Sequence, residues 1–252
     1  MRLLVLGKSP AWPDPGGACS GYLLEQDGFT LLLDCGAGVL GKLAEVQDYL
    51  TLDAVLISHL HADHILDLIP FSYALNLSPR RGDPPRRPPL HAPPGSLDMF
   101  RRLGACWNDE DLLTQAFAVT EYHPSDPLEV GPFAVRFREV PHYTQAFACE
   151  FTAGGSRITF GADCGPNDAL VEFAQDTDLL IVEASLREPD TDVPRGHMTP
   201  REAGEAGQAA RARRLLVTHF SDELGVDWVR QESGRGYGSE VIMAEGGAEL
   251  TV

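Results

Sequence analysis

The sequence predicts an α/β fold in which two β-sheets pack together and helices lie outside them. Short apolar runs of strand length recur in both halves of the chain, and stretches with helical spacing lie between them. Hydrophobic residues make up 43% of the 252 residues, which is enough for a sizeable core. A chain of this length suits one large domain or two small ones.

The first half is expected to alternate strands with helices. The second and third strands form a hairpin, because Asp27 and Gly28 between them favour a tight turn. One face of the first helix is apolar, with Val39, Leu40, Leu43 and Val46 at helical spacing. The expected strands are residues 2–7, 21–26, 29–34 and 53–58, and the expected helices are residues 37–48 and 63–75.

Residues 78–95 differ from the rest of the chain because they are rich in proline and arginine. This composition predicts an exposed, irregular loop. Two interpretations are open for the arginines at 80–87: they belong to a solvated connector, or they form a basic rim that meets an anionic substrate.

The second half of the chain is also expected to contain strands with helices between them. Gly154 and Gly155 are expected to form a turn between two strands. Two strands close the chain around Gly246 and Gly247. The expected strands are residues 133–140, 146–153, 157–163, 179–183, 215–218, 240–244 and 248–252, and the expected helices are residues 167–175 and 200–211.

Composition limits the partners and the compartment. The formal net charge of −17 repels nucleic acid at long range, so extended binding of RNA or DNA is not expected. A small phosphate-bearing substrate stays compatible, because a metal ion dominates the field in its own site. Five cysteines without zinc-type spacing indicate a reducing cytoplasm. No apolar run is long enough for a membrane span, and the N-terminal run is too short for a signal peptide.

The most informative stretch runs from His59 to His64 and contains three histidines and one aspartate. It follows a predicted buried strand, so His59 and His61 project to the same side of the strand end. Asp63 and His64 come where the chain turns into a helix. A metal ion would compensate so many polar groups beside a buried strand, since imidazole and carboxylate are good zinc-type ligands. The alternative is a solvated histidine-rich turn.

Four further polar residues lie at strand ends or in loops, where a rigid scaffold commonly carries its site. His142 follows one strand, Asp163 and His219 end two others, and His197 lies in a loop before a helix. Two other histidines, His91 and His123, lie in proline-flanked segments without comparable polar residues nearby. They are expected to be ordinary surface residues.

With these residues in place, the chain resembles the metallo-β-lactamase superfamily and, within it, the ribonuclease Z-like branch. The family motif His-x-His-x-Asp-His matches residues 59–64, and the later family positions match His142, Asp163 and His219. Residues 34–36 match the family's Asp-Cys-Gly, and residues 196–199 match the branch's Gly-His-Met-Thr. The resemblance implies one domain over residues 1–252, folded as a four-layer αββα sandwich of two packed mixed β-sheets flanked by helices.

The resemblance also implies a site for two divalent metal ions, Zn²⁺ first, with Mn²⁺ or Fe²⁺ as alternatives. The first ion would take His59, His61 and His142. The second would take Asp63, His64 and His219, and Asp163 would bridge the two. Such a pair leaves open positions for a bridging hydroxide, which is a nucleophile at neutral pH, and for phosphoryl oxygens.

Three catalytic roles follow from the same resemblance. Asp63 would also accept a proton from the bridging water, and His197 would stabilise the transition state or protonate the leaving oxygen. Glu183 would orient His197 by accepting its other N–H. Asp34 would tether the ligand loops through hydrogen bonds. Thr199 is the expected N-cap of the helix that begins at Pro200.

Two departures from ribonuclease Z affect the predicted substrate. Its His-Glu-Ala-Thr segment reads Val-Glu-Ala-Ser at residues 182–185, and Asp163 follows His142 by only 21 positions, which leaves no room for a tRNA-gripping arm. The predicted function is therefore a dinuclear phosphodiesterase for a small phosphodiester such as a cyclic nucleotide. The alternatives are a ribonuclease Z-type tRNA 3′ endonuclease, a lactonase or thioesterase, and a non-catalytic metal-binding protein. Relatives are often homodimers, so a homodimer is a further expectation.

Overall fold

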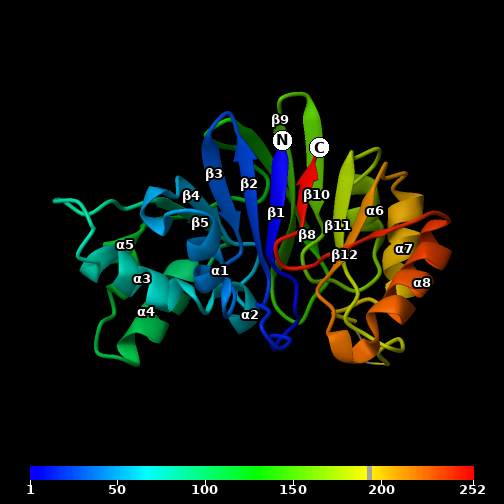
Figure 1. The fold of residues 1–252 in the computed structure, drawn as a ribbon, viewed down its shortest axis with the longest axis horizontal. Coiled ribbons are helices and arrows are strands. Elements are labelled where there is room, and N and C mark those ends of the chain that lie inside the picture. The colour runs from blue at the N-terminus through cyan, green and yellow to red at the C-terminus, as the bar shows by residue number, and fades with distance from the viewer. Residues whose placement is uncertain (192–194) are drawn as a thin grey trace.

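The computed structural model describes residues 1–191 and 195–252. Within them, two seven-stranded sheets pack together (Figure 1). In spatial order, the first sheet contains β14 (Glu249–Thr251), β1 (Arg2–Gly7), β2 (Gly21–Gln26), β3 (Phe29–Leu33), β4 (Ala54–Leu56), β5 (Pro89–Ala92) and β6 (Ala118–Glu121). The second contains β13 (Ile242–Met243), β12 (Leu215–Thr218), β11 (Leu179–Glu183), β10 (Ser156–Phe160), β9 (Ala146–Ala153), β8 (Phe133–Val140) and β7 (Leu128–Val130).

Helices cover the outer faces of the two sheets. In Figure 1, α3 to α5 lie on one side of the molecule and α6 to α8 on the other. The helices are α1 (Val39–Val46), α2 (Ala62–Ile65), α3 (Leu68–Leu77), α4 (Ser96–Ala105), α5 (Leu112–Ala116), α6 (Asp168–Phe173), α7 (Pro200–Ala209) and α8 (Val226–Tyr237), with 3-10 turns η1 (Tyr49–Thr51) and η2 (Asp222–Leu224). Both sheets mix parallel and antiparallel pairs. The predicted αββα sandwich is therefore confirmed.

The alternation of side chains along β1 shows how the layers are held together. Leu3 and Val5 pack into the core that the two sheets share, whereas Leu4 and Leu6 pack into a second core with α1, α3, α4 and α5. Both faces of β1 are therefore buried, which explains its uninterrupted apolar sequence.

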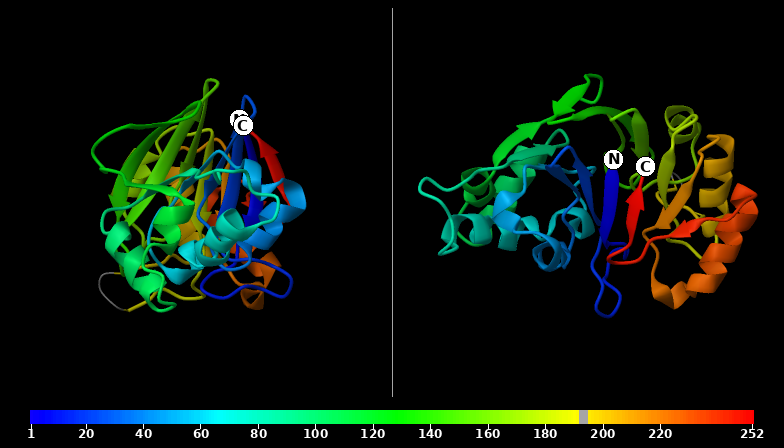
Figure 2. Two further views of the ribbon diagram at one scale, coloured as in Figure 1. Left: turned by 90° about the vertical axis from the view of Figure 1, so that its left-hand side faces the viewer. Right: turned by 45° about the horizontal axis from the view of Figure 1, so that its top comes forward.

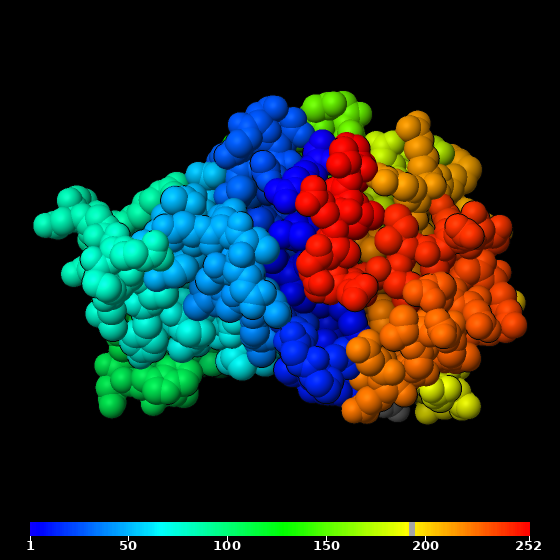
Figure 3. Space-filling model, viewed as in Figure 1, coloured from blue at the N-terminus to red at the C-terminus, as the bar shows by residue number. Residues whose placement is uncertain are grey.

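The two ends of the chain meet in the first sheet. β14 pairs antiparallel with β1, and the Met1 amino group donates to the carbonyl oxygen of Val252 at 3.1 Å. Figure 2 shows the termini side by side, and Figure 3 shows the C-terminal residues on the surface between the N-terminal residues and the second half. The last two strands, β13 and β14, were expected together around Gly246 and Gly247, but they belong to different sheets.

The four strands and the first helix that were predicted within residues 2–58 are confirmed, with small shifts at their ends. The hairpin turns at Asp27 and Gly28, both with positive φ. On the apolar face of α1, Val39 and Leu43 are buried, whereas Val46 is 48% exposed. One expectation is wrong. The helix expected over 63–75 is two helices, α2 and α3, because Pro70 lacks an N–H and fits only the first turn of α3.

The loop expected over 78–95 is irregular only in part. Residues 89–92 form β5, which pairs in parallel with β4 and β6, so His91 lies in a strand instead of on a surface loop. Arg80 pairs with Asp48 at 2.7 Å, and Arg86 pairs with Asp53 at 3.1 Å. These contacts attach the loop to the protein itself and favour the connector interpretation. No described helix is long and apolar enough to cross a membrane.

A buried hydrogen bond between two side chains links the sheets beside the predicted site. The Tyr22 hydroxyl of β2 lies 2.6 Å from Thr218 Oγ1 at the end of β12, and both residues are buried. We predict that Tyr22→Phe lowers the free energy of unfolding by about 1–3 kcal/mol, because it leaves the Thr218 hydroxyl unpaired.

Urea denaturation in the presence of a chelator measures this change without a contribution from metal binding. The exposed Tyr73 provides the control, since Tyr73→Phe should leave stability within about 0.5 kcal/mol. In a double-mutant cycle, Thr218→Val should recover part of the loss. Equal stability of Tyr22→Phe and the unaltered protein would contradict the prediction.

Candidate metal centre

The candidate site forms where loops from both sheets meet. His59 follows β4 and makes an isolated bridge with Ala146 at the start of β9, so it joins the first sheet to the second. His142, Asp163 and His219 follow β8, β10 and β12 of the second sheet. The seven residues predicted as metal ligands are therefore brought together from four strand ends.

The local backbone explains how four of these residues fit into six positions. His61 is extended and is the N-cap of α2, so Asp63 and His64 lie in its first turn. Gly36 makes this turn possible, because a Cβ at that position would come within 1.8 Å of the Asp63 carbonyl oxygen. The Cys35 N–H also donates to the His64 carbonyl oxygen at 2.7 Å. The Asp-Cys-Gly segment thus holds the histidine motif in place.

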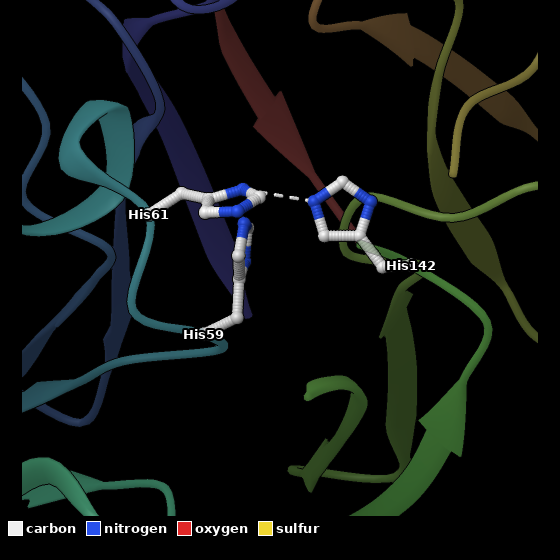
Figure 4. Close-up of side chains that lie close together, drawn as sticks. All are labelled: His59, His61 and His142. Carbon is white, nitrogen blue, oxygen red and sulfur yellow. Dashed lines mark hydrogen bonds between the residues drawn. The ribbon is translucent and has the colours of Figure 1, made fainter. Parts of the chain in front are cut away.

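The first cluster consists of His59, His61 and His142. Their ligand nitrogens all lie within 4.8 Å of one another, and the rings point toward one another in Figure 4. His61 Nδ1 and His142 Nε2 are 2.9 Å apart. This set matches the three residues predicted for one metal ion.

The second cluster consists of Asp63, His64, Asp163 and His219, again with ligand atoms within 4.8 Å. Asp163 Oδ2 lies 3.3 Å from His64 Nε2 and 3.1 Å from His219 Nε2. The same oxygen lies 3.8 Å from His59 Nε2 of the first cluster. Asp163 is thus within reach of both clusters, as a bridging ligand would be.

Outer contacts fix the orientation of four of these imidazoles. In each ring, Nδ1 lies within hydrogen-bond distance of a neighbouring oxygen, and Nε2 is left for the candidate metal centre. The Nδ1 contacts are His59 to Ser58 Oγ (3.1 Å), His64 to Asp34 Oδ2 (2.7 Å), His142 to the Gly196 carbonyl (2.7 Å) and His219 to Ser185 Oγ (2.8 Å). This arrangement is the one in which a histidine presents a lone pair on Nε2 to a metal ion.

The chemistry of the donor set fits a divalent cation. Among the described residues, His59 Nε2 and His64 Nε2 are buried without a hydrogen-bond partner. Burial, followed by the neighbouring His64, lowers the pKa of His59 well below its usual value. Burial opposes ionisation of Asp163, but His219 and His64 lower its pKa well below the usual range. A neutral imidazole and a buried carboxylate are metal ligands in their binding forms.

Asp34 does what the sequence predicted, which is to tether the ligand loops. Its Oδ1 accepts from the Ser58 N–H at 2.8 Å, and its Oδ2 accepts from the Ser58 hydroxyl at 2.8 Å. The same Oδ2 meets His64 Nδ1, so one carboxylate supports both ends of the motif. Asp34 is fully buried.

His197 and Glu183 lie next to the centre, as predicted. His197 Nδ1 is 2.7 Å from Glu183 Oε1, and Thr199 and Glu202 form a capping box that begins α7 at Pro200. Burial alone would lower the pKa of His197, but the hydrogen bond and the charge of Glu183 raise it to about 9.

Ser185 is a site residue that the sequence did not reveal. Its Oγ lies 2.6 Å from Glu183 Oε2 and 2.8 Å from His219 Nδ1, so it connects a carboxylate to a candidate metal ligand. The one available signal was its place at the end of the Val-Glu-Ala-Ser segment, where ribonuclease Z has threonine. Glu183 therefore supports two histidines, His197 directly and His219 through Ser185.

A cavity of about 670 Å³ opens beside the centre. Its lining includes five polar residues of the site, which are His61, Asp63, Asp163, His197 and His219. It also includes the apolar residues Pro10, Ala11, Trp12, Leu186 and Leu224. None of residues 78–95 is among its described lining, so the arginine-rich loop is not its rim.

Comparison with known proteins agrees with this geometry. Residues 30–220 match the family described as Beta-lactamase superfamily domain. The protein named Probable metallo-hydrolase YhfI from Bacillus subtilis (strain 168) is 32% identical over 248 residues, 98% of each chain. Its crystal structure covers 99% of each chain with a TM-score of 0.87 and 30% identity.

More distant relatives include ribonucleases. A ribonuclease Z from Ignicoccus hospitalis is 26% identical over 87% of this chain and 88% of its own length. The structure of human tRNase Z, short form, has a TM-score of 0.76 and 24% identity over 100% of this chain and 99% of that one, a likeness of fold. The chain therefore belongs to the beta-lactamase superfamily, as a metallo-hydrolase with ribonuclease Z-like relatives.

Proposed function

We propose that this chain is a dinuclear metal-dependent phosphodiesterase that acts on a small phosphodiester such as a cyclic nucleotide. The observation that carries the proposal is the pair of ligand clusters within reach of one carboxylate, that of Asp163. His59, His61 and His142 would hold one divalent ion. Asp63, His64 and His219 would hold the other.

When bound, two divalent ions would act as Lewis acids toward the oxygens of a phosphoryl group and would lower the pKa of a metal-bound water to about 7. Imidazole and carboxylate donors suit Zn²⁺ first, with Mn²⁺ and Fe²⁺ as alternatives. Asp63 and His197 both line the cavity, so their side chains can act on a substrate there. Asp63 would accept a proton from the attacking water.

His197 would act at the leaving oxygen. Its Nδ1 is engaged by Glu183, which leaves Nε2 as the nitrogen available to a substrate. From that position it would donate a hydrogen bond or a proton as the P–O bond breaks. Glu183 would keep the ring in the required orientation, and its buried carboxylate also accepts from the Cys164 N–H at 2.9 Å.

Three observations favour a small substrate. Between His142 and Asp163 the chain forms only the hairpin of β9 and β10, with no inserted arm. The net charge of −17 opposes a long grip on a polyanion. The described lining of the cavity contains no lysine or arginine, so nothing there pairs with a row of phosphates.

A tRNA 3′ endonuclease is the second candidate, because two of the relatives are ribonucleases by name. Incubation of the metal-loaded protein with a precursor tRNA separates the two. Removal of the 3′ trailer at a rate comparable to hydrolysis of a cyclic nucleotide would favour this candidate.

We predict that the Zn²⁺- or Mn²⁺-loaded protein hydrolyses bis(p-nitrophenyl) phosphate and that a chelator abolishes the reaction. His61→Ala removes a candidate ligand and should lower kcat/KM by more than about 100-fold. The surface residue His123 provides the control, because its ring contacts Ser125 and Asp126 and, among the described residues, none of the candidate ligands. Release of p-nitrophenol measures the rate. No turnover by the metal-loaded protein would refute the proposed function.

His197→Ala should lower kcat by about 10²–10⁴-fold, because it removes the group at the leaving oxygen. The metal content of this variant should equal that of the unaltered protein, since His197 belongs to neither ligand set. Elemental analysis and steady-state kinetics on the same preparations measure both quantities. If the metal content falls together with kcat, the residue serves as a ligand and its assigned role is wrong.

Asp34→Asn should weaken metal binding by about 10–100-fold, because an amide is a poorer acceptor for His64 and Ser58 than a carboxylate. Competition with a chromophoric chelator measures the affinity. The matched control is Asp48→Asn, which alters an exposed carboxylate that pairs with Arg80. An unchanged affinity in Asp34→Asn would show that its hydrogen bonds do not support the site.

A further inference from the structure

The cavity beside the candidate metal centre contains one large aromatic side chain, Trp12. It lies in the loop between β1 and β2, and 53% of its surface is exposed. Pro10, Ala11, Leu186 and Leu224 add apolar surface to the lining of the same cavity. An exposed indole in such a lining is a flat surface that favours stacking with another ring.

The loop that carries Trp12 is fixed to the site. Asp14 Oδ2 accepts from Lys8 Nζ at 2.6 Å, and its Oδ1 accepts from the Ser221 hydroxyl at 3.2 Å and the Asp222 N–H at 3.0 Å. Ser221 and Asp222 lie two and three positions after the candidate ligand His219. The loop that carries Trp12 is therefore attached to the segment that follows His219.

The charges around the cavity describe the rest of the ligand. Positive charge is available only at the metal centre and its histidines, because the described lining has no lysine or arginine. The exposed carboxylate of Glu223 lies on the lining near Leu224 and can accept hydrogen bonds from hydroxyl or amino groups. A fitting ligand has one anionic group, which the metal centre attracts. It also has a flat ring with hydrogen-bond donors, which can contact Trp12 and Glu223.

We propose that Trp12 is the specificity-determining residue of this cavity and stacks on the base of a nucleoside phosphodiester. The single phosphoryl group of that substrate lies at the metal centre, and its ribose hydroxyl or exocyclic amino group faces Glu223. This inference rests on the proposed function and makes it more specific. It distinguishes a nucleoside substrate from a small diester that carries no ring.

Two substrates that release the same leaving group test the inference. Thymidine 5′-(p-nitrophenyl phosphate) carries a base, and methyl p-nitrophenyl phosphate does not. Base stacking on an aromatic side chain corresponds to about tenfold or more in affinity. In Trp12→Ala, the ratio of kcat/KM for the thymidine ester to that for the methyl ester should therefore fall about tenfold, with most of the change in KM. Trp12→Phe should retain most of the ratio.

Trp107 provides the matched control, because it is 50% exposed and does not line the cavity. Trp107→Ala should leave the ratio unchanged within about twofold. An equal loss on both esters in Trp12→Ala would mean that the residue only supports the structure. No change on either ester would mean that the base lies elsewhere. Both results would overturn the inference.

A binding measurement separates failure of this inference from failure of the proposed function. Thymidine 5′-monophosphate should quench the tryptophan fluorescence of the metal-loaded protein, and Trp12→Phe should abolish the quenching. Quenching without turnover of either ester would refute the phosphodiesterase and keep the stacking site. Turnover with an unchanged ratio and no quenching would refute the stacking site and keep the phosphodiesterase.

Discussion

The buried carboxylate of Asp163 is the constraint on which the site depends. It is 2% exposed, and its Oδ2 lies between 3.1 and 3.8 Å from nitrogens of His59, His64 and His219. His59 and His64 follow β4 of the first sheet, and His219 follows β12 of the second, so the two sheets must pack in one relative position for the contacts to form. An ionised carboxylate without compensating charge would be costly at this depth. The site and the sandwich are therefore mutually dependent.

Support for the ligands follows a single pattern, although the supporting groups are chemically different. The hydrogen-bond partner is a hydroxyl for His59, a carboxylate for His64, a backbone carbonyl for His142 and a second hydroxyl for His219. In each case the contact is made by Nδ1. The fold thus places a hydrogen-bond acceptor beside Nδ1 of each histidine, and several residue types can provide it. This explains how Ser185 can support His219 while donating its own proton to Glu183.

Sequence reasoning found the parts of the structure that have local signals. The strands β11 and β12 consist almost entirely of apolar residues, and the seven candidate ligands form an ordered motif set that the structure brings together. Residues 96–132 gave no comparable signal, and α4, α5, β6 and β7 lie there. β5 was missed because Pro89 begins a strand that is otherwise only three residues long. Ser185 and the separation of β13 from β14 depend on tertiary contacts, which no local pattern contains.

The acidic character of the chain is compatible with the proposed anionic substrate only if the positive charge is local. A net charge of −17 lowers the concentration of any anion near the surface. The described cavity lining contains both imidazoles of the candidate metal centre and the apolar side chains of Trp12, Leu186 and Leu224. A ligand with one phosphate would gain the full attraction of the proposed centre and could place its ring against the apolar residues of the lining. A ligand with many phosphates would place the remainder against an acidic surface, and each additional phosphate would weaken its binding.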